Sequence, residues 1–241
     1  MNFINKIRKL RYLATRLDFL KGLRYNIPAA IEHIQVLKLI DNPNTFIDIG
    51  ANKGQFSLAA RHAYSDAAII SFEPLSGPAE IFKKVFTKDQ NIVLHQSAIG
   101  PDKSSQSMHV SKRNDSSSLL PIGIGQSNIF PGTDESHTEK VKVAPLHHFL
   151  QKNDFVPPVF VKIDVQGYEL QVLKGCDELT HLFNYIYVEC SFMELYEKQA
   201  LAHEVITFLN SRSFHLKGIY NTFYDKKGIA VQADFLFRKS R

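Results

Sequence analysis

The residues best suited to chemistry in this 241-residue sequence lie where short apolar runs end. Asp48 closes one such run, and the turn that follows contains Gly50, Asn52 and Gly54 before a helical pattern begins at Gln55. Small residues between a strand and a helix let a ligand approach the backbone, and the first helical turn offers free N–H groups. Asn52 and Gln55 stand where the dinucleotide motif Gly-x-Gly-x-x-Gly requires glycines, and no Gly-Lys-Ser/Thr triplet follows. The turn therefore predicts a ligand without a pyrophosphate.

A second carboxylate, Glu73, ends the next apolar run, 25 residues after Asp48, and Pro74 then turns the chain out of the strand. A carboxylate at that edge can accept two hydrogen bonds from a ribose diol. A glycine turn alone is as often a structural helix start, and a lone Glu at a strand end is often only solvated. In this order the two motifs predict a nucleoside-binding site.

Apolar runs and helical patterns alternate from residue 45 onward. The predicted strands cover 45–49, 68–72, 92–96, 159–164, 185–189, 214–220 and 234–238, and helical segments cover 55–64, 79–86, 169–182 and 200–211. This alternation predicts an α/β fold with a doubly wound, mostly parallel seven-stranded sheet. Residues 101–151 depart from the pattern and are interpreted as an insertion before the fourth parallel strand. We expect the insertion to stand over the carboxyl edge of the sheet and to face the substrate.

The N-terminal segment, residues 1–43, precedes the α/β domain of residues 44–241 and is strongly basic at its start. Apolar residues at three- and four-residue steps predict an amphipathic helix within residues 1–24, which hold seven basic residues and one acidic residue. A second helix is expected over 29–40. The basic helix either packs on the domain or on a second subunit, or contacts a membrane surface peripherally. The rest of the chain has 22 basic and 23 acidic residues, so we expect no nucleic acid partner.

The cysteine content and hydropathy indicate the compartment. Two cysteines 14 residues apart fit neither a disulfide scaffold nor a thiolate zinc site. No stretch approaches the roughly 20 apolar residues of a membrane span, and the early apolar positions are too often interrupted by charge for a signal peptide. We expect a cytoplasmic protein, peripheral at the inner membrane surface if the basic helix binds lipid.

Six ordered motifs give the sequence a family resemblance. They occupy residues 48–54, 72–74, 97–100, 116–119, 162–170 with 173–175, and 234–237. The sequence resembles the FkbM-type methyltransferases, a branch of the class I S-adenosylmethionine-dependent enzymes, over about residues 44–238. It departs from the family pattern at Gln166, where an acidic residue is usual, and at His147, where an Asp is common.

The resemblance implies which residues hold the cofactor, S-adenosylmethionine. The methionine end would be lined by Asp48, Gly50, Asn52 and Gly54, the ribose hydroxyls held by Glu73, and the adenine bordered by Gln96, Ser97 and Ala98. Methyl transfer from a sulfonium is an in-line displacement, so the protein must align the acceptor and help to remove its proton.

Asp164, at the end of the fourth parallel strand, is the first candidate for the base. His147 and His148 from the insertion are alternatives, and Lys162 is a neighbouring charge. Asp164 is also a candidate helix N-cap, and a surface position is the more common role for the two histidines. Glu189, at the next strand end, could pair with Asp164 around a divalent cation, although two acids at adjacent strand ends are expected of any polar cleft.

The sequence after Asp164 bears on the acceptor. It continues as Val165, Gln166 and Gly167, unlike the Asn/Asp-Pro-Pro-aromatic signature of amino methyltransferases that act on bases. We therefore expect an O-methyltransferase acting on a hydroxyl of a saccharide, glycolipid or natural product. Two alternatives stay open: a noncatalytic nucleoside-binding module that docks on a membrane-associated assembly, and an NAD-dependent dehydrogenase or epimerase.

Overall fold

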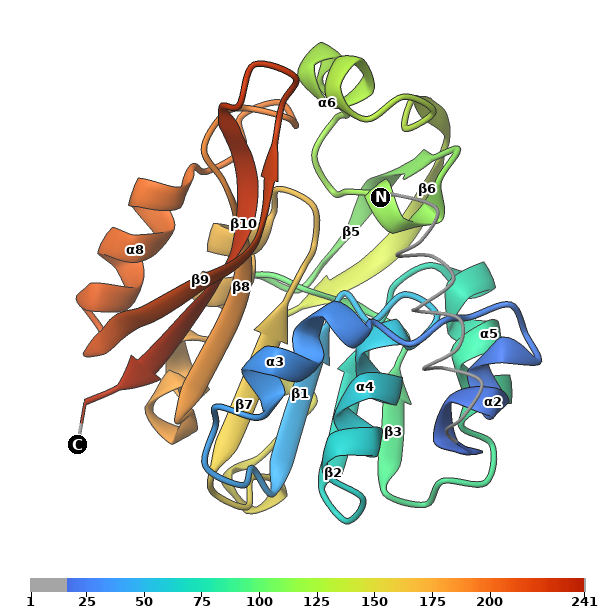
Figure 1. Cartoon of the computed structure of the whole chain (residues 1–241), viewed down its shortest axis with the longest axis vertical. Coiled ribbons are helices and arrows are strands. Elements are labelled where there is room, and N and C mark those ends of the chain that lie inside the picture. The colour runs from blue at the N-terminus through green and yellow to red at the C-terminus, as the bar shows by residue number, and fades with distance from the viewer. Residues whose placement is uncertain (1–16, 241) are drawn as a thin grey trace.

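The computed structural model describes residues 17–240 and is built around a seven-stranded sheet (Figure 1). The strand order is β3-β2-β1-β7-β8-β10-β9, and the bounds are β1 Thr45–Ile49, β2 Ala68–Phe72, β3 Ile92–His95, β7 Val159–Ile163, β8 Tyr185–Ser191, β9 Phe214–Tyr224 and β10 Ala230–Lys239. The first five in spatial order are parallel, and β10 runs antiparallel to both of its neighbours. All seven predicted strands are present, which confirms the α/β fold.

Helices cover both faces of the sheet, so β1 and β7 are buried along their whole length. One face carries α2 (Leu17–Leu23), α3 (Ile34–Leu37), α4 (Gln55–Ala63) and α5 (Ser76–Val85), and the other carries α7 (Glu169–Gly175) and α8 (Ala202–Asn210). Burial along the whole strand explains why these strands appear in the sequence as mainly apolar runs rather than as alternating patterns.

Two predicted helices differ from the structure. The segment predicted as one helix over 169–182 is α7 followed by a 3-10 helix, η5 (Asp177–Leu182). The break follows Gly175, where an added Cβ would lie 2.4 Å from the carbonyl oxygen of Gly100, so α7 is pressed against that loop. The segment predicted over 29–40 is a 3-10 turn, η1 (Ile31–His33), that leads into the single turn of α3.

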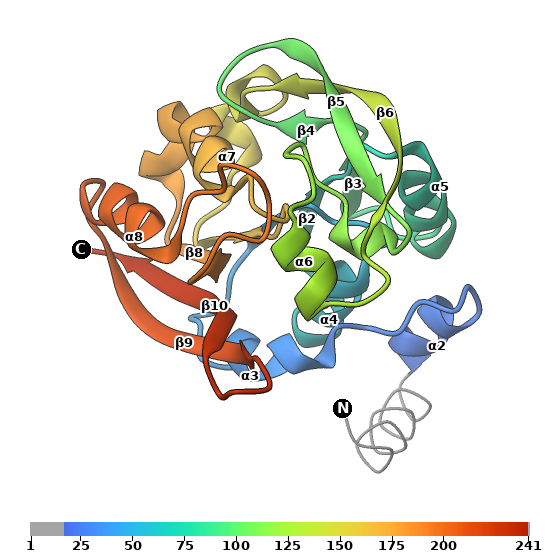
Figure 2. The ribbon, with the colours of Figure 1, turned by 90° about the horizontal axis from the view of Figure 1, so that it is seen from above.

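The insertion forms a layer of its own over the carboxyl edge of the sheet (Figure 2). Its strands β5 (Ser104–Ser111) and β6 (Glu135–Ala144) pair antiparallel, and the short β4 (Ala98–Ile99) joins β6 in a three-stranded sheet. Between β5 and β6 lie the 3-10 turn η2 (Asn114–Ser116) and α6 (Ile124–Ile129), a helix that the sequence pattern does not predict. An isolated bridge between Ile122 and Tyr196 ties this layer to the segment after β8.

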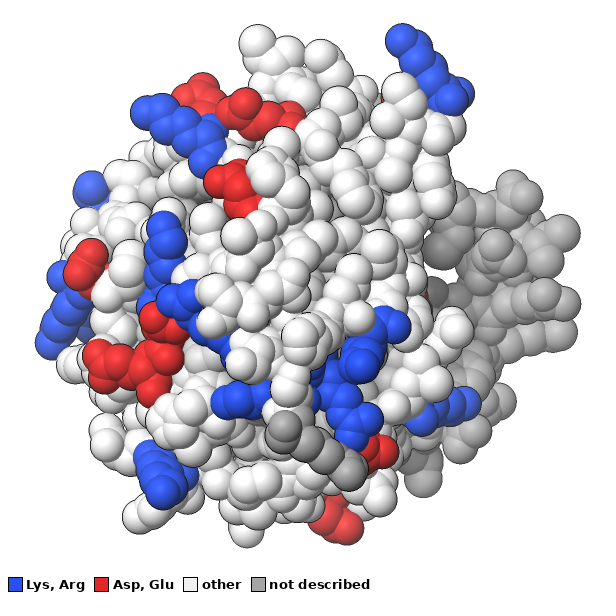
Figure 3. Space-filling model, turned by 90° about the vertical axis from the view of Figure 1, so that its left-hand side faces the viewer, with Lys and Arg blue, Asp and Glu red and all other residues white. Residues whose placement is uncertain are grey.

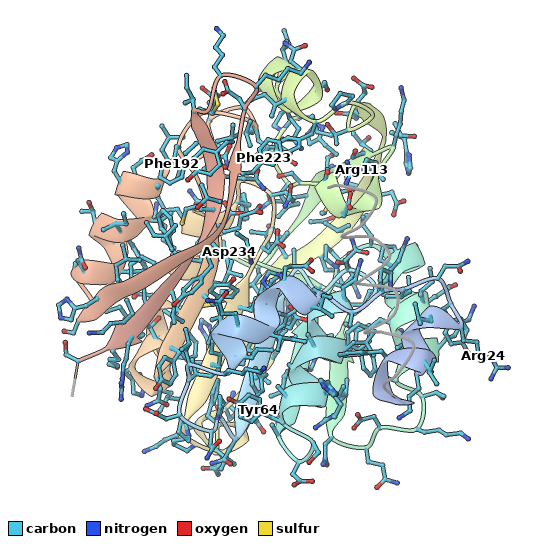
Figure 4. All side chains as sticks on the ribbon, viewed as in Figure 1. Arg24, Tyr64, Arg113, Phe192, Phe223 and Asp234 are labelled. Atoms are coloured by element: carbon cyan, nitrogen blue, oxygen red, sulfur yellow. The ribbon has the colours of Figure 1, made fainter. Side chains whose placement is uncertain are left out.

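The described part of the N-terminal segment packs on the α/β domain. Phe19 is fully buried with Leu58 of α4 and Phe82 of α5. Arg24, directly after α2, is exposed (Figure 4). Most of the predicted basic helix, and with it most of the membrane-contact surface expected for residues 1–24, lies outside the described residues.

Two further observations, on membrane-spanning helices and on surface charge, bear on possible partners. Within residues 17–240 there is no helix with the length and apolar character that crossing a membrane requires. On the face formed by α8 and β9, Lys and Arg side chains occur together with Asp and Glu (Figure 3). That face therefore carries charges of both signs rather than one continuous basic field.

Candidate active site

A cavity of about 240 Å³ opens at the carboxyl ends of β1, β2 and β7. Its floor is the turn after β1, and its walls come from the ends of β2 and β7, from the insertion and from η1. Strand ends of a parallel sheet are where α/β folds bind ligands. The predicted site residues Gly50, Asn52, Glu73, Ser97, Ala98, Lys162 and Asp164 all line it.

The glycine turn is held in a shape that only glycine fits at its first position. Gly50 has φ +83°, and an added Cβ would lie 1.9 Å from the carbonyl oxygen of Asp164. Gly54 has φ +92°, but its missing side chain faces Phe82 and Phe86 of α5 rather than the cavity. Gly50 thus lets β1 and β7 converge at the cavity floor, whereas Gly54 lets α5 approach the start of α4.

Glu73 links the turn to the end of β2. One carboxylate oxygen accepts the Asn52 N–H at 2.9 Å, and the other accepts the Leu75 N–H at 2.8 Å. Burial raises the pKa of Glu73 to about 7, and only 5% of the residue is exposed. Each oxygen keeps a second lone pair that can accept from a hydroxyl in the cavity. This arrangement fits a ribose diol, because the diol would donate to the ionised form and offset part of the burial.

Two buried oxygens beside the turn have no hydrogen-bond partner among residues 17–240. One is Oδ1 of Asn52, a residue of the cavity lining, and the other is Oδ1 of Asp48. Asp48 lies beneath the turn, fully buried, with Ser57 Oγ donating to its Oδ2 at 2.7 Å. Burial raises the pKa of Asp48, and the nearby Lys162 ammonium partly counteracts this. Unpaired buried acceptors are costly, so a bound group that donates hydrogen bonds or carries positive charge would stabilise this end of the cavity.

The other end of the cavity is enclosed by apolar and backbone groups around Ser97 and Ala98. Ser97 Oγ lies 3.0 Å from the carbonyl oxygen of Lys142 and donates to it, which fixes the segment against β6. Gln96 is exposed and does not contribute to the cavity wall. Its expected contact with an adenine therefore has no counterpart among the lining residues.

Asp164 is held from two sides. Lys162 Nζ donates to Oδ2 at 3.0 Å, and Gln166 Nε2 donates to Oδ1 at 2.8 Å. Burial raises the pKa of Asp164, but the Lys162 ammonium and the Gln166 amide outweigh it and leave the pKa below its ordinary value. For Lys162, burial alone would lower the pKa, but the carboxylates of Asp164 and Asp48 outweigh burial and raise it above its ordinary value. Asp164 and Lys162 are thus a charged pair at the cavity wall.

Gln166 separates Asp164 from Glu189. Its Nε2 also donates to Glu189 Oε2, at 2.9 Å, so an amide stands between the two carboxylates considered for a cation. Burial raises the pKa of Glu189 well above its ordinary value, as do the charges of Asp164 and Asp234. Across residues 17–240, no three His, Cys, Asp or Glu side chains are grouped so that they could hold a metal ion.

The two histidines of the insertion lie away from the cavity. His147 and His148 belong to the 3-10 turn η3 (Leu146–His148). The His147 side chain is 41% exposed, with Nδ1 3.3 Å from Glu178 Oε2, and His148 is exposed. Neither is among the lining residues, so the structure does not bring them together with Asp164.

Several lining residues carry polar groups that the sequence does not single out for catalysis. They are His33 from η1, Asp115 and Ser117 from the insertion, and Tyr168 after β7. Residues 116–118 stand out in the sequence as a serine run within the insertion expected to face the substrate, but the sequence does not show which of them lines the cavity. His33 lies in a predicted helix far from the other motifs, and only the packing of η1 against the sheet brings it to the cavity.

The strand order, with the glycine turn and the Glu73 carboxylate at the carboxyl edge of the sheet, is the arrangement of the class I methyltransferase fold. A family model described as methyltransferase FkbM domain matches residues 48–216. The chain belongs to the FkbM methyltransferase family, as the sequence motifs predicted.

Individual relatives are distant. Methyltransferase 1 of Beauveria bassiana (strain ARSEF 2860) is 26% identical over 145 residues, which cover 55% of this chain and 58% of that protein. The structure of M. capricolum TrmK with the cofactor product S-adenosyl-homocysteine aligns with a TM-score of 0.50 at 11% identity, covering 86% of this chain and 67% of that one. A precorrin-6y C5,15-methyltransferase from Geobacter metallireducens GS-15 aligns with a TM-score of 0.49 at 12% identity, over 89% and 95% of the chains. At such identities the structural match concerns the fold alone.

Proposed function

We propose that this protein transfers the methyl group of S-adenosylmethionine to a hydroxyl of a saccharide, glycolipid or natural-product acceptor. The main support for a hydroxyl acceptor is a set of hydrogen-bonding side chains that line the cavity next to the glycine turn: His33, Lys162, Asp164 and Gln166. Such groups suit an acceptor that presents hydroxyls, because each can donate to or accept from an O–H.

The residues that would hold the cofactor follow from the geometry of the turn. The Glu73 carboxylate would accept the ribose hydroxyls, and the unpaired Oδ1 of Asn52 would accept from the amino end. Ser97 and Ala98 would border the base. The cofactor supplies an activated methyl carbon, so the protein's part is to bind, align and exclude water.

Asp164 and Lys162 would position the acceptor. Both Asp164 oxygens already accept a hydrogen bond, and its lowered pKa makes it a weaker base than an ordinary Asp. One remaining lone pair on each oxygen can still accept from acceptor hydroxyls, and Lys162 fixes the carboxylate in place.

Transfer of labelled methyl groups to matched acceptors tests the proposal. The panel would contain methyl glycosides, the same glycosides with one hydroxyl replaced by hydrogen or by an amino group, and free nucleosides. We expect label in a glycoside, and loss of label when one particular hydroxyl is removed. Label that appears only in the amino compounds or nucleosides would contradict hydroxyl transfer while leaving the methyltransferase class intact.

A further inference from the structure

Four polar side chains from four different elements meet beside the cavity: His33 of η1, Tyr187 of β8, Asn221 of β9 and Asp234 of β10. His33 Nδ1 lies 3.1 Å from Tyr187 Oη and 3.5 Å from Asp234 Oδ2. Figure 4 shows Asp234 in the middle of the molecule. His33 and Asn221 lie outside both residues 48–216 and the sequence motifs, whereas Asp234 begins the last of those motifs and Tyr187 lies within the matched residues.

The contacts of the cluster favour one placement of its protons. Tyr187 Oη donates to Asp234 Oδ2 at 3.0 Å, and burial raises the pKa of Tyr187, which keeps the hydroxyl protonated. Asn221 Nδ2 lies 2.8 Å from Asp234 Oδ2, 3.2 Å from Tyr187 Oη and 3.3 Å from His33 Nδ1, and its two hydrogens are assigned to the two nearer atoms, both oxygens. Tyr187 Oη can then accept a further hydrogen only from His33 Nδ1. Because Nδ1 faces the Tyr187 hydroxyl oxygen and the Asp234 carboxylate, both acceptors, these contacts favour the tautomer with the proton on Nδ1 and a lone pair on Nε2.

The Nε2 edge of His33 is the one left for the cavity. His33 lines the cavity, its side chain is 12% exposed, and Nδ1 is turned toward the sheet. The rings of Phe56 and Tyr187, each with its centroid 5.6 Å away and edge-on to the imidazole, fix its orientation. Within residues 17–240, Nε2 accepts and donates no hydrogen bond.

We propose that His33 is the general base of the methyl transfer, held in the reactive tautomer by Tyr187 and Asp234. The inference rests on the proposed function and names a catalytic residue for it. In this step the hydroxyl proton of the acceptor passes to Nε2, and the acceptor oxygen forms a bond to the methyl carbon. The bond from that carbon to the sulfonium sulfur breaks, and its electron pair stays on sulfur.

The electrostatic surroundings keep His33 neutral and ready to accept a proton. Burial lowers its pKa, and the Lys162 ammonium adds to this effect, while the carboxylates of Asp234, Glu32 and Asp164 oppose it. Phe56 presents only an apolar ring from α4. The imidazolium formed during transfer would be stabilised by Asp234, whose Oδ2 lies 3.5 Å from Nδ1.

The first test needs no acceptor. Nitrogen-15 NMR of the protein with bound S-adenosylhomocysteine, assigned by comparison with His33→Asn, reports the tautomer and the titration of His33. We expect an unprotonated Nε2 at pH 7.5 and a midpoint below 6.5. A neutral ring that carries its proton on Nε2 would overturn the proposal, because that nitrogen could not accept.

The second test compares His33→Asn with His203→Asn, an exposed histidine of α8, using the glycoside acceptor methylated by the wild type. We expect His33→Asn to lower kcat by about 100-fold or more, to remove the fall in rate at low pH, and to bind S-adenosylhomocysteine within about twofold of wild type. His203→Asn should leave all three unchanged. An active wild type with a His33→Asn rate within about threefold would overturn the role of His33 alone. A wild type that methylates no hydroxyl would instead overturn the proposed function.

Discussion

Replacing Gly50 by Ala should damage the site far more than the same change at another glycine of matched backbone shape. Gly132 has φ +84°, close to the +83° of Gly50, but an added Cβ there would meet nothing within 4 Å. At Gly50 the Cβ would lie 1.9 Å from the Asp164 carbonyl oxygen and 2.9 Å from its carbon. The pair therefore separates the conformational cost, which both share, from the steric cost, which only Gly50 has.

The magnitudes follow from the two costs. Ala in the left-handed region costs about 1 kcal/mol, which is the whole effect expected for Gly132→Ala. Relief of the contact at Gly50 requires the turn and the end of β7 to separate by about 1 Å, and overpacking of this kind adds about 2 kcal/mol. We expect Gly50→Ala to lower the free energy of unfolding by about 3 kcal/mol.

Urea unfolding and calorimetric titration with S-adenosylhomocysteine would measure both consequences. Because the displaced segment includes Asp164 and the turn that Glu73 holds, Gly50→Ala should also weaken binding by about tenfold or more, and Gly132→Ala should not. Equal losses of stability in the two variants, with unchanged binding in both, would refute the convergence of β1 and β7 at Gly50.

Three further predictions concern buried charges. At pH 7, binding of S-adenosylhomocysteine to the wild type should release about half a proton, because the pKa of Glu73 is about 7 and ribose hydroxyls favour its ionised form. Calorimetry in buffers of different ionisation enthalpy measures this release. The release should be absent in Glu73→Gln. Burial raises the pKa of Glu169 from 4.5 to about 7, so its contribution to stability is fully present below pH 4.5 and is lost as the pH rises through 7. The unfolding free energy of the wild type minus that of Glu169→Gln should therefore fall by about 3 kcal/mol between pH 4.5 and 8. A rise in this difference with pH would contradict the predicted sign. Asp164→Asn removes the partner of buried Lys162 and should lower the free energy of unfolding by about 2 kcal/mol. The double variant with Lys162→Met should recover most of this loss. Equal stabilities of the single and double variants would contradict the ion pair.

The sequence predicted the sheet well because its central strands are buried on both faces. The run 45–49 of β1 is apolar apart from Thr45 and Asp48, and the turn after it needs a glycine at position 50 for a steric reason that the residue type itself reveals. Glu73 was also predictable from a local pattern, because it directly follows the buried strand β2 and precedes a proline. These features are local, and local patterns are what a single sequence records.

The polar clusters were not predictable, because their members come from elements far apart in the chain. His33 lies 201 residues before Asp234, and no spacing rule connects them. Gln166 appeared as a departure from the family pattern, and its role as a bridge between Asp164 and Glu189 depends on the pairing of β7 with β8. His147 was a candidate because it lies in the insertion expected to face the substrate, but in the structure its Nδ1 lies 3.3 Å from Glu178 Oε2, away from the cavity.

The most direct test of the central claim is a calorimetric titration of the whole protein with S-adenosylhomocysteine, beside Glu73→Gln and with NADH as the control ligand. The account predicts saturable binding of the thioether to the wild type, binding weakened about tenfold or more in Glu73→Gln, and none of NADH. Binding of NADH, or binding of S-adenosylhomocysteine that does not change in Glu73→Gln, would contradict the methyl-donor site built on the glycine turn and Glu73.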